Sequence, residues 1–365
     1  MAPSRLAIGS KIEQYFIRTP DSNTAQIDSV LNMKTKLIYS LCATGILSLL
    51  LVSGVSGQEK KPGIAVSEEE MKALNAINAM TDPAAKLKAV DDFLKKYPKS
   101  PARLNIAEAV AGEIAKVNDS AQAISLGESA RALFTSDEEL EPIRGVLLDS
   151  YVKATRSDDV FKMGTEILSK NPDEVHAHVQ LAFTAANEVR KQNPKFVQPG
   201  LQSGLKAIEL IEADKKPAKM DPTNWASHKL LLPAIYQQVA VLNLVAGNAA
   251  EARVKASKSA ELGPTDPTSF ALLGMIINND YLKLATSYKT MPEGKDKEAT
   301  LKKLEGLIDE VIDAYAHAIA LAIGKPEHQS MMQQLTVDVT SYYKFRHNQS
   351  TDGLQALIDK YKPKP

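Results

Sequence analysis

Apolar residues recur every three or four positions from Ser67 almost to the C-terminus, which is the spacing of one face of an α-helix. Pro, Gly, Asn and Asp interrupt this pattern between successive segments, and no segment shows the apolar-polar alternation of a half-buried strand. The pattern therefore predicts an all-α protein. The predicted helices span residues 67–80, 83–97, 100–116, 119–134, 138–155, 157–170, 173–191, 197–213, 222–246, 248–262, 267–289, 297–323, 327–346 and 351–361.

Several of these helices begin with residues that cap a helix. Ser67 is followed three positions later by Glu70, which is the spacing of a capping box. Asp82 and Asp266 each precede a proline, and proline is favoured at the first helical position. Short helices joined by short links bury too little surface one pair at a time, so the pairs must stack on one another, as in an α-solenoid.

The strongest repeat signal lies between Gly247 and Pro264. Gly247 suits a tight turn between two helices, and Pro264 ends the unit because proline cannot continue a helix. Ala252 and Ala256 lie between them and are small enough to let a neighbouring helix approach closely.

A large, an apolar and a small residue recur at the same three positions in the first helix of several helix pairs. These sets are His178, Leu181 and Ala182, then Tyr236, Val239 and Ala240, then Phe270, Leu273 and Gly274. With these residues the chain resembles the tetratricopeptide repeat (TPR) family, and in particular exported bacterial TPR proteins, whose unit has about 34 residues. The resemblance implies a right-handed α-solenoid of about seven irregular antiparallel helix pairs over residues 67–361. Gly274→Leu should then force two helices apart and destabilise the array.

Two segments depart from a regular repeat. The excess length in 280–300 contains the polar run from Met291 to Lys297, which we interpret as a loop between two elongated helices. Pro233 interrupts the apolar run of the predicted helix 222–246, which favours a kink there because proline lacks a backbone N–H.

The first 57 residues lack the pattern of the rest. A short basic start at 33–36, an uncharged apolar run at 37–55 and small residues up to Gly57 follow the order of a secretory signal peptide over 33–57. This order predicts export, with the bacterial periplasm as the expected location. The alternative is an uncleaved inner-membrane anchor formed by residues 37–55, since this run is just long enough to span a bilayer.

The flanking segments are expected to lie outside the fold. Residues 1–32 are polar and unpatterned, and we interpret them as a disordered upstream segment of an over-extended gene prediction, with Met33 as the true start. Residues 58–66 are predicted to be a linker and residues 362–365 a basic tail.

Composition narrows the possible functions. The 365 residues include 44 basic and 44 acidic side chains, and this zero net charge argues against bulk electrostatic binding of nucleic acid. The one cysteine, Cys42, lies inside the apolar run, so a disulfide framework and a cysteine-rich metal site are excluded. Phosphate-binding loops, dinucleotide fingerprints, zinc-protease motifs and nucleophile elbows are absent from the sequence. We therefore predict a protein that is not an enzyme and has no cofactor and no metal.

Isolated candidate residues favour structural roles. His176 and His178 are two positions apart, so on a helix they point in different directions and make poor joint metal ligands. We expect His178 to be packed and His176 to lie on the surface. Trp225 is the one tryptophan, and a place in a helix-pair core is favoured over a role as ligand anchor.

The resemblance also implies where a partner would bind, because the first helix of each TPR pair lines the concave face. The positions expected on that face are His176, Val179, Phe183, Asn187, Gln237, Val241, Met275 and Asn279. Apolar residues mixed with Asn and Gln fit an extended or helical partner segment, and the Lys and Asn set of a carboxylate clamp is missing. The alternative for each position is packing between repeats.

These observations favour a non-enzymatic scaffold for protein–protein interaction in the cell envelope, with a protein or peptide partner and no nucleic acid. Membrane contact is expected only if residues 37–55 stay uncleaved. One alternative is small-molecule capture inside the superhelix, lined by Trp225, Phe183 and Tyr236. Another is a glycan-acting enzyme or its accessory subunit, which would need paired carboxylates on the inner face. The inner-face positions above include no Asp or Glu.

Overall fold

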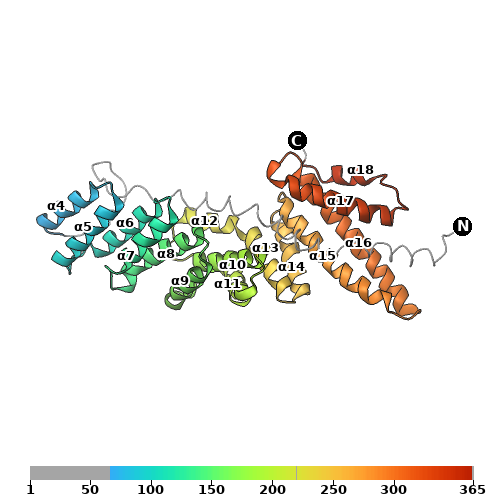
Figure 1. The fold of residues 1–365 in the computed structure, drawn as a ribbon, viewed down its shortest axis with the longest axis horizontal. Coiled ribbons are helices and arrows are strands. Elements are labelled where there is room, and N and C mark those ends of the chain that lie inside the picture. The colour runs from blue at the N-terminus through green and yellow to red at the C-terminus, as the bar shows by residue number, and fades with distance from the viewer. Residues whose placement is uncertain (1–65, 219, 364–365) are drawn as a thin grey trace. The chain divides into compact units, whose positions relative to one another are not determined.

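The computed structural model describes residues 66–218 and 220–363, and these residues form helices joined by short loops, without a β-strand (Figure 1). The α-helices are α4 (Glu68–Asn78), α5 (Pro83–Lys96), α6 (Arg103–Ala115), α7 (Ser120–Arg131), α8 (Asp137–Lys153), α9 (Ser157–Lys170), α10 (Val175–Arg190), α11 (Val197–Glu212), α12 (Pro222–Leu230), α13 (Leu232–Val245), α14 (Ala249–Leu262), α15 (Pro267–Lys289), α16 (Lys295–Ala322), α17 (Gln329–Arg346) and α18 (Leu354–Lys360). Two short 3-10 helices, η1 (Pro194–Phe196) and η2 (Pro326–His328), precede α11 and α17.

The helices follow one another as seven pairs, from α4 and α5 to α17 and α18, with α12 as an additional helix. A second helix packs against the next first helix, as α7 does on α8 and α14 on α15. First helices of neighbouring pairs also touch, as α6 does with α8 and α13 with α15. Contact limited to neighbouring repeats is the architecture of an α-solenoid. The predicted all-α solenoid of about seven helix pairs is therefore confirmed.

The described chain divides into two compact units. The N-terminal unit consists of residues 66–184 together with 214–225. The C-terminal unit consists of residues 185–213 together with 226–363. One boundary between them falls inside α10, between Thr184 and Ala185.

Local capping explains where several helices begin. The hydroxyl of Ser67 accepts a hydrogen bond from the Glu70 amide at 3.2 Å, and the Glu70 carboxylate accepts one from the Ser67 amide at 2.8 Å. The carboxylates of Asp82 and Asp266 each accept a hydrogen bond from a backbone amide in the first turn, at 2.7 and 3.2 Å. These bonds satisfy amides that have no partner within the helix. All three predicted caps are confirmed.

The prediction of one helix over 222–246 is wrong, because two helices occupy this range. Helix α12 ends at Leu230 and α13 begins at Leu232. Pro233 lies in the first turn of α13, where its fixed φ suits a helix start and its missing N–H costs no hydrogen bond. The loop expected between elongated helices is present, because α15 has 23 residues, α16 has 28, and residues 290–294 join them.

The small residues of the repeat pattern lie at close helix contacts. Gly274 of α15 faces Tyr315 of α16, and a Cβ on Gly274 would lie 2.5 Å from the Tyr315 ring. Ala252 and Ala256 are fully buried in the core shared by α13, α14 and α15. Gly247 turns the chain between α13 and α14 with φ of +84°, a conformation that glycine adopts without strain. The positions chosen for small side chains are thus confirmed.

A second glycine contact recurs between neighbouring pairs of the N-terminal unit. A Cβ on Gly127 of α7 would lie 2.6 Å from the Leu147 side chain of α8. The equivalent position on Gly164 of α9 lies 2.8 Å from the Leu181 side chain of α10. The same contact at successive pairs shows that they share one packing register.

Several predictions fall outside the described residues. The upstream segment 1–32, the signal peptide 33–57, the alternative anchor 37–55 and nearly all of the linker 58–66 are among them. Within the residues described, no helix has both the length and the apolar character needed to cross a membrane. Of the predicted basic tail, Lys362 pairs with Asp359 at 2.7 Å.

Candidate functional site

A polar cluster joins α8 and α10 in the N-terminal unit. The Nε2 atom of His176 lies 2.7 Å from Oδ1 of Asp149, and the Gln180 amide donates to the same oxygen at 3.2 Å. Gln180 is buried, whereas the side chains of His176 and Asp149 remain 23% and 34% exposed. Because residues at spacings of three or four share a helix face, His176 and Gln180 are followed on the same face by Phe183. The cluster therefore offers polar atoms and an aromatic ring along one face of α10.

Asp149 controls the charge of His176. Burial favours the neutral imidazole, but the negative charge of Asp149 and its hydrogen bond outweigh burial and raise the pKa of His176 to about 9. At pH 7 the cluster is consequently an imidazolium-carboxylate pair. We expected His176 on the surface, and this was wrong in part, because the pairing with Asp149 holds the ring half-buried.

Two glycines leave helix backbone uncovered in the same unit. Gly145 lies one turn before Asp149 on α8, and Gly112 lies on α6, which packs against α8. No heavy atom lies within 4 Å of the place where a Cβ would be on either glycine. Glycine inside a helix costs about 1 kcal/mol relative to alanine, and here no neighbouring side chain requires it. The backbone at Gly145 is therefore open to close approach by another molecule.

Half of the positions predicted to line a partner groove are buried. These are Val179, Gln237, Val241 and Met275. Val241 and Met275 belong to the core between α13, α14 and α15. The side chains of these four residues fill the spaces between helices, which is the alternative that the sequence left open.

Gln237 illustrates this packing role. Its amide donates to a carboxylate oxygen of Asp266 at 2.6 Å and to the Ser269 hydroxyl at 2.7 Å. The Ser269 hydroxyl in turn lies 3.0 Å from that of Ser259, which donates to the Pro233 carbonyl at 2.8 Å. These bonds tie the start of α15 to α13 and α14. Gln237 therefore fixes the position of neighbouring helices.

The other four predicted positions are partly exposed but fall in different units. His176 and Phe183 belong to the N-terminal unit, whereas Asn187 and Asn279 belong to the C-terminal unit. Within the N-terminal unit the structure adds Asp149 to His176 and Phe183. Asp149 could not be predicted from the sequence, because it lies on α8, on a different helix pair from His176, and no local pattern joins them.

The remaining candidate residues are structural. His178 is buried, and its Nε2 atom lies 2.9 Å from the Pro172 carbonyl oxygen, which confirms that it is packed. Trp225 is buried and donates from its indole nitrogen to Asp214 at 2.8 Å. Tyr236 is buried as well and donates to Glu212 at 2.7 Å. The core role favoured for Trp225 is confirmed.

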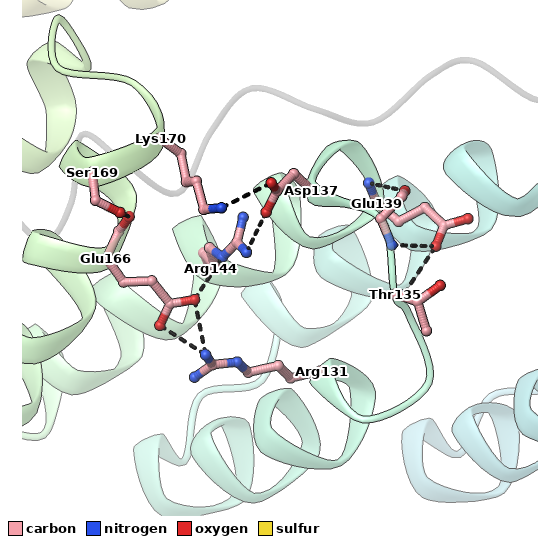
Figure 2. A network of polar contacts seen from close by, with 9 residues as sticks. Arg131, Thr135, Asp137, Glu139, Arg144, Glu166, Ser169 and Lys170 are labelled. Atoms are coloured by element: carbon pink, nitrogen blue, oxygen red, sulfur yellow. Dashed lines mark hydrogen bonds and ion pairs between the residues drawn. The ribbon is translucent and has the colours of Figure 1, made fainter.

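A separate network of charges holds the second and third helix pairs together (Figure 2). Arg144 of α8 donates to Glu166 at 2.8 Å and to Asp137 at 2.9 Å. Glu166 also accepts from Arg131 at 2.7 Å, and Asp137 accepts from Lys170 at 3.0 Å. Each charged group in this network has an opposite partner on α7, α8 or α9, so the network joins these helices.

One further pocket lies in the N-terminal unit. This pocket, between α5, α6 and α7, is lined mainly by apolar side chains, with Lys86 and Glu113 3.5 Å apart among the lining residues. No group of three or more His, Cys, Asp or Glu side chains in the described part of the chain is placed to hold a metal ion.

Comparison with known proteins adds little about the site. No family model and no curated protein matches the sequence. Similar solved structures include a monomeric IFIT1 mutant with m7Gppp-AAAA and another with Gppp-AAAA. For each, the TM-score is 0.37 at 14% identity, over 77% of this chain and 56% of that chain. This chain thus matches little more than half of their length, and a TM-score this low implies nothing about a shared site or partner.

Proposed function

We propose that this chain is a non-enzymatic binding scaffold of the TPR type in the bacterial cell envelope. Its partner is a protein segment that lies across α8 and α10 in the N-terminal unit. The observation that carries the proposal is the uncovered backbone at Gly145 beside the half-buried Asp149–His176 pair. A helical repeat array offers such a surface without a deep pocket.

The chemistry of the face suits an extended peptide. A peptide backbone presents alternating N–H donors and carbonyl acceptors, which imidazolium, amide and carboxylate groups can bind. His176 and Asp149 supply the imidazolium and the carboxylate, and the amide of the buried Gln180 donates to Asp149 and holds it in place. Gly145 lets the peptide approach without meeting a side chain, and Phe183 adds an apolar surface on α10.

Site-specific crosslinking tests this proposal. A photoreactive amino acid replaces Gly145 in the full chain, which carries an affinity tag, and crosslinked partners are identified by mass spectrometry. The matched control places the same group at Thr165, which is exposed on α9, a second helix. We expect one dominant partner from position 145 and none from 165. Equal crosslinking from both positions would contradict the proposal.

Phe183→Ala separates binding from folding. If Phe183 contacts the partner, its removal should weaken partner capture strongly and change the melting temperature little, because the ring is only half-buried. Capture of the partner identified above is compared for the wild type and the variant at matched concentrations. A large loss of stability with unchanged capture would show that Phe183 is a packing residue.

Export rests on the sequence of residues 33–57. The expected cleavage after Gly57 gives a mature chain that begins at Gln58. N-terminal sequencing of the protein from the envelope fraction checks this. A peptide from residues 2–32 in the native protein would contradict both the cleavage and the start at Met33.

A further inference from the structure

Helix α17, the first helix of the last described pair, has an exposed side without charge (Figure 1). Its fully exposed residues are Gln329, Ser330, Gln333, Thr336 and Val337. Val337 is 63% exposed, which leaves a branched apolar side chain in water. On the neighbouring α16, most exposed residues are instead Lys, Asp or Glu. Depletion of charged residues distinguishes the centre of an interface from the rest of a protein surface. We call this side of the helix, from Gln329 to Thr340, the α17 face.

The α17 face points away from α15. Tyr342 of α17 is directed toward α15, where its hydroxyl donates to Asn278 at 2.6 Å. Successive residues of an α-helix are rotated by about 100°, so Gln333 and Thr340 lie on the side opposite Tyr342. First helices of neighbouring pairs touch in this protein, as α13 and α15 do. The α17 face is therefore on the side where the first helix of a following pair would pack.

Covering the α17 face would leave its threonine hydroxyls satisfied. The Thr336 hydroxyl donates to the Met332 carbonyl at 2.7 Å, and the Thr340 hydroxyl donates to the Thr336 carbonyl at 2.6 Å. Both hydroxyls have a partner inside the helix and keep it when water is removed. Thr336, Val337 and Thr340 are β-branched, so they lose few rotamers on burial. A second helix can therefore pack here at little cost.

Charges of opposite sign lie at the two ends of the α17 face. Glu327 is exposed just ahead of α17, and Lys344 is half-buried one turn after Thr340. Neither side chain forms an ion pair within the described residues. When two such helices run antiparallel, the Lys344 end of one meets the Glu327 end of the other. The face is therefore complementary to itself, with an uncharged centre and ends that attract each other.

We propose that two copies of this chain associate through the α17 face, with their α17 helices antiparallel. A two-fold axis near Val337 makes both copies use the same residues, as in an isologous interface. Each copy then occupies the side where the first helix of a following pair would pack. One helix per copy buries less than the roughly 800 Å² per partner of a standard interface, so the dimer is reversible. This dimer uses the C-terminal unit and is independent of the partner face on α8 and α10.

Crosslinking through a single cysteine tests this dimer. The full chain carries Cys42→Ser and Val337→Cys, so its one thiol lies at the centre of the α17 face. The protein is treated with a short bismaleimide at increasing concentration. We expect a covalent dimer whose yield rises with concentration, because the two-fold axis brings position 337 of each copy together.

A matched control measures random collision. Ser257→Cys replaces Val337→Cys in the same Cys42→Ser chain, and Ser257 is exposed on α14 of the same unit. The dimer yield from position 257 should stay well below the yield from position 337 at every concentration. Equal yields from the two positions would overturn the proposal.

Charge reversal at the two ends provides a second, independent measurement. Glu327→Lys or Lys344→Glu, each added to the Val337→Cys chain, replaces attraction by repulsion at both ends of the dimer. We expect either change to lower the dimer yield at low concentration roughly tenfold, the scale of two exposed ion pairs turned into like-charge contacts. The two changes together make the ends opposite again and should restore the yield. A double variant as impaired as the single variants would contradict the antiparallel arrangement.

Discussion

Glycines inside the helices of this protein occupy two opposite environments. Gly274 faces the buried ring of Tyr315 at a distance where no Cβ fits. Gly145 has no neighbour at all where its Cβ would be. The same residue type is therefore required by packing at one position and is free of packing constraints at the other.

This difference predicts opposite effects of one substitution. Gly274→Ala should lower the free energy of unfolding by about 1–3 kcal/mol through overpacking, and Gly274→Leu should lower it further. Gly145→Ala should raise it by about 0.4–1 kcal/mol, because alanine restricts the unfolded chain. Chemical denaturation of both variants measures these values. A higher free energy of unfolding for Gly274→Ala would show that the close contact at Tyr315 is not rigid, and a lower one for Gly145→Ala would show that the space at Gly145 is not open.

The His176 pair predicts a pH dependence at alkaline pH. The pKa of His176 is raised from an ordinary value near 6.5 to about 9, so the folded protein binds its proton more tightly than the unfolded chain does. The resulting stability is fully present below pH 6.5 and is lost as the pH rises through about 9. Stability curves of the wild type and Asp149→Asn between pH 6 and 10 test this. The variant should lack this loss, and parallel curves would contradict the assignment.

At the scale of the element, ion pairs hold neighbouring helices together. Arg144 projects from α8 and bonds Glu166 of α9 and Asp137 of its own first turn. The Arg144 side chain is largely buried. Breaking one of its ion pairs therefore costs more stability than breaking an exposed ion pair does. This arrangement sets how firmly α9 is held on α8.

Removing the central guanidinium should therefore loosen α9. We expect Arg144→Met to lower the free energy of unfolding by about 1–3 kcal/mol, because Glu166 loses a charged hydrogen bond while most of the buried volume is retained. The matched control is Arg156→Met, whose side chain is half exposed and pairs with Asp159 in the next turn. This control should change stability by less than about 0.5 kcal/mol. Equal losses would show that the network contributes no more than a surface pair.

At the scale of the whole molecule, the cooperativity of unfolding is limited because each repeat contacts mainly its neighbours. Stability in a solenoid is spread along the array as contributions from repeats and their interfaces. The described chain forms two compact units, and Trp225, the one tryptophan, lies in the N-terminal unit. Its fluorescence therefore reports the unfolding of that unit, whereas circular dichroism reports all helices.

We accordingly expect unfolding in more than one step. In urea, the transition followed by Trp225 fluorescence should not superimpose on the transition followed by far-ultraviolet circular dichroism. A variant that combines Trp225→Phe with Tyr343→Trp carries its one tryptophan on α17. Its fluorescence transition should then follow the unfolding of the C-terminal unit. Coincident transitions in both proteins would show that the two units unfold together.

Much of the fold could be predicted because it depends on interactions between residues that are close in the sequence. The caps at Ser67, Asp82 and Asp266 depend on residues within one turn, and all three form as expected. The small residue at Gly274 could be assigned because the repeat pattern places it against a neighbouring helix. The break before Pro233 was expected as a kink and is a full separation of two helices, because the first turn of α13 tolerates proline better than a helix interior does.

The sequence by itself determined that the chain is helical, where most helices begin and which positions need small side chains, since each depends on spacing along one or two helices. Only the tertiary structure decided which side chains meet across helices. It buried Gln237, Val241 and Met275, and it placed Asp149 beside His176. A helix has several faces that can bury apolar residues, and the angle at which neighbouring helices pack selects among them. That angle depends on all contacts of the array together, so no local pattern contains it.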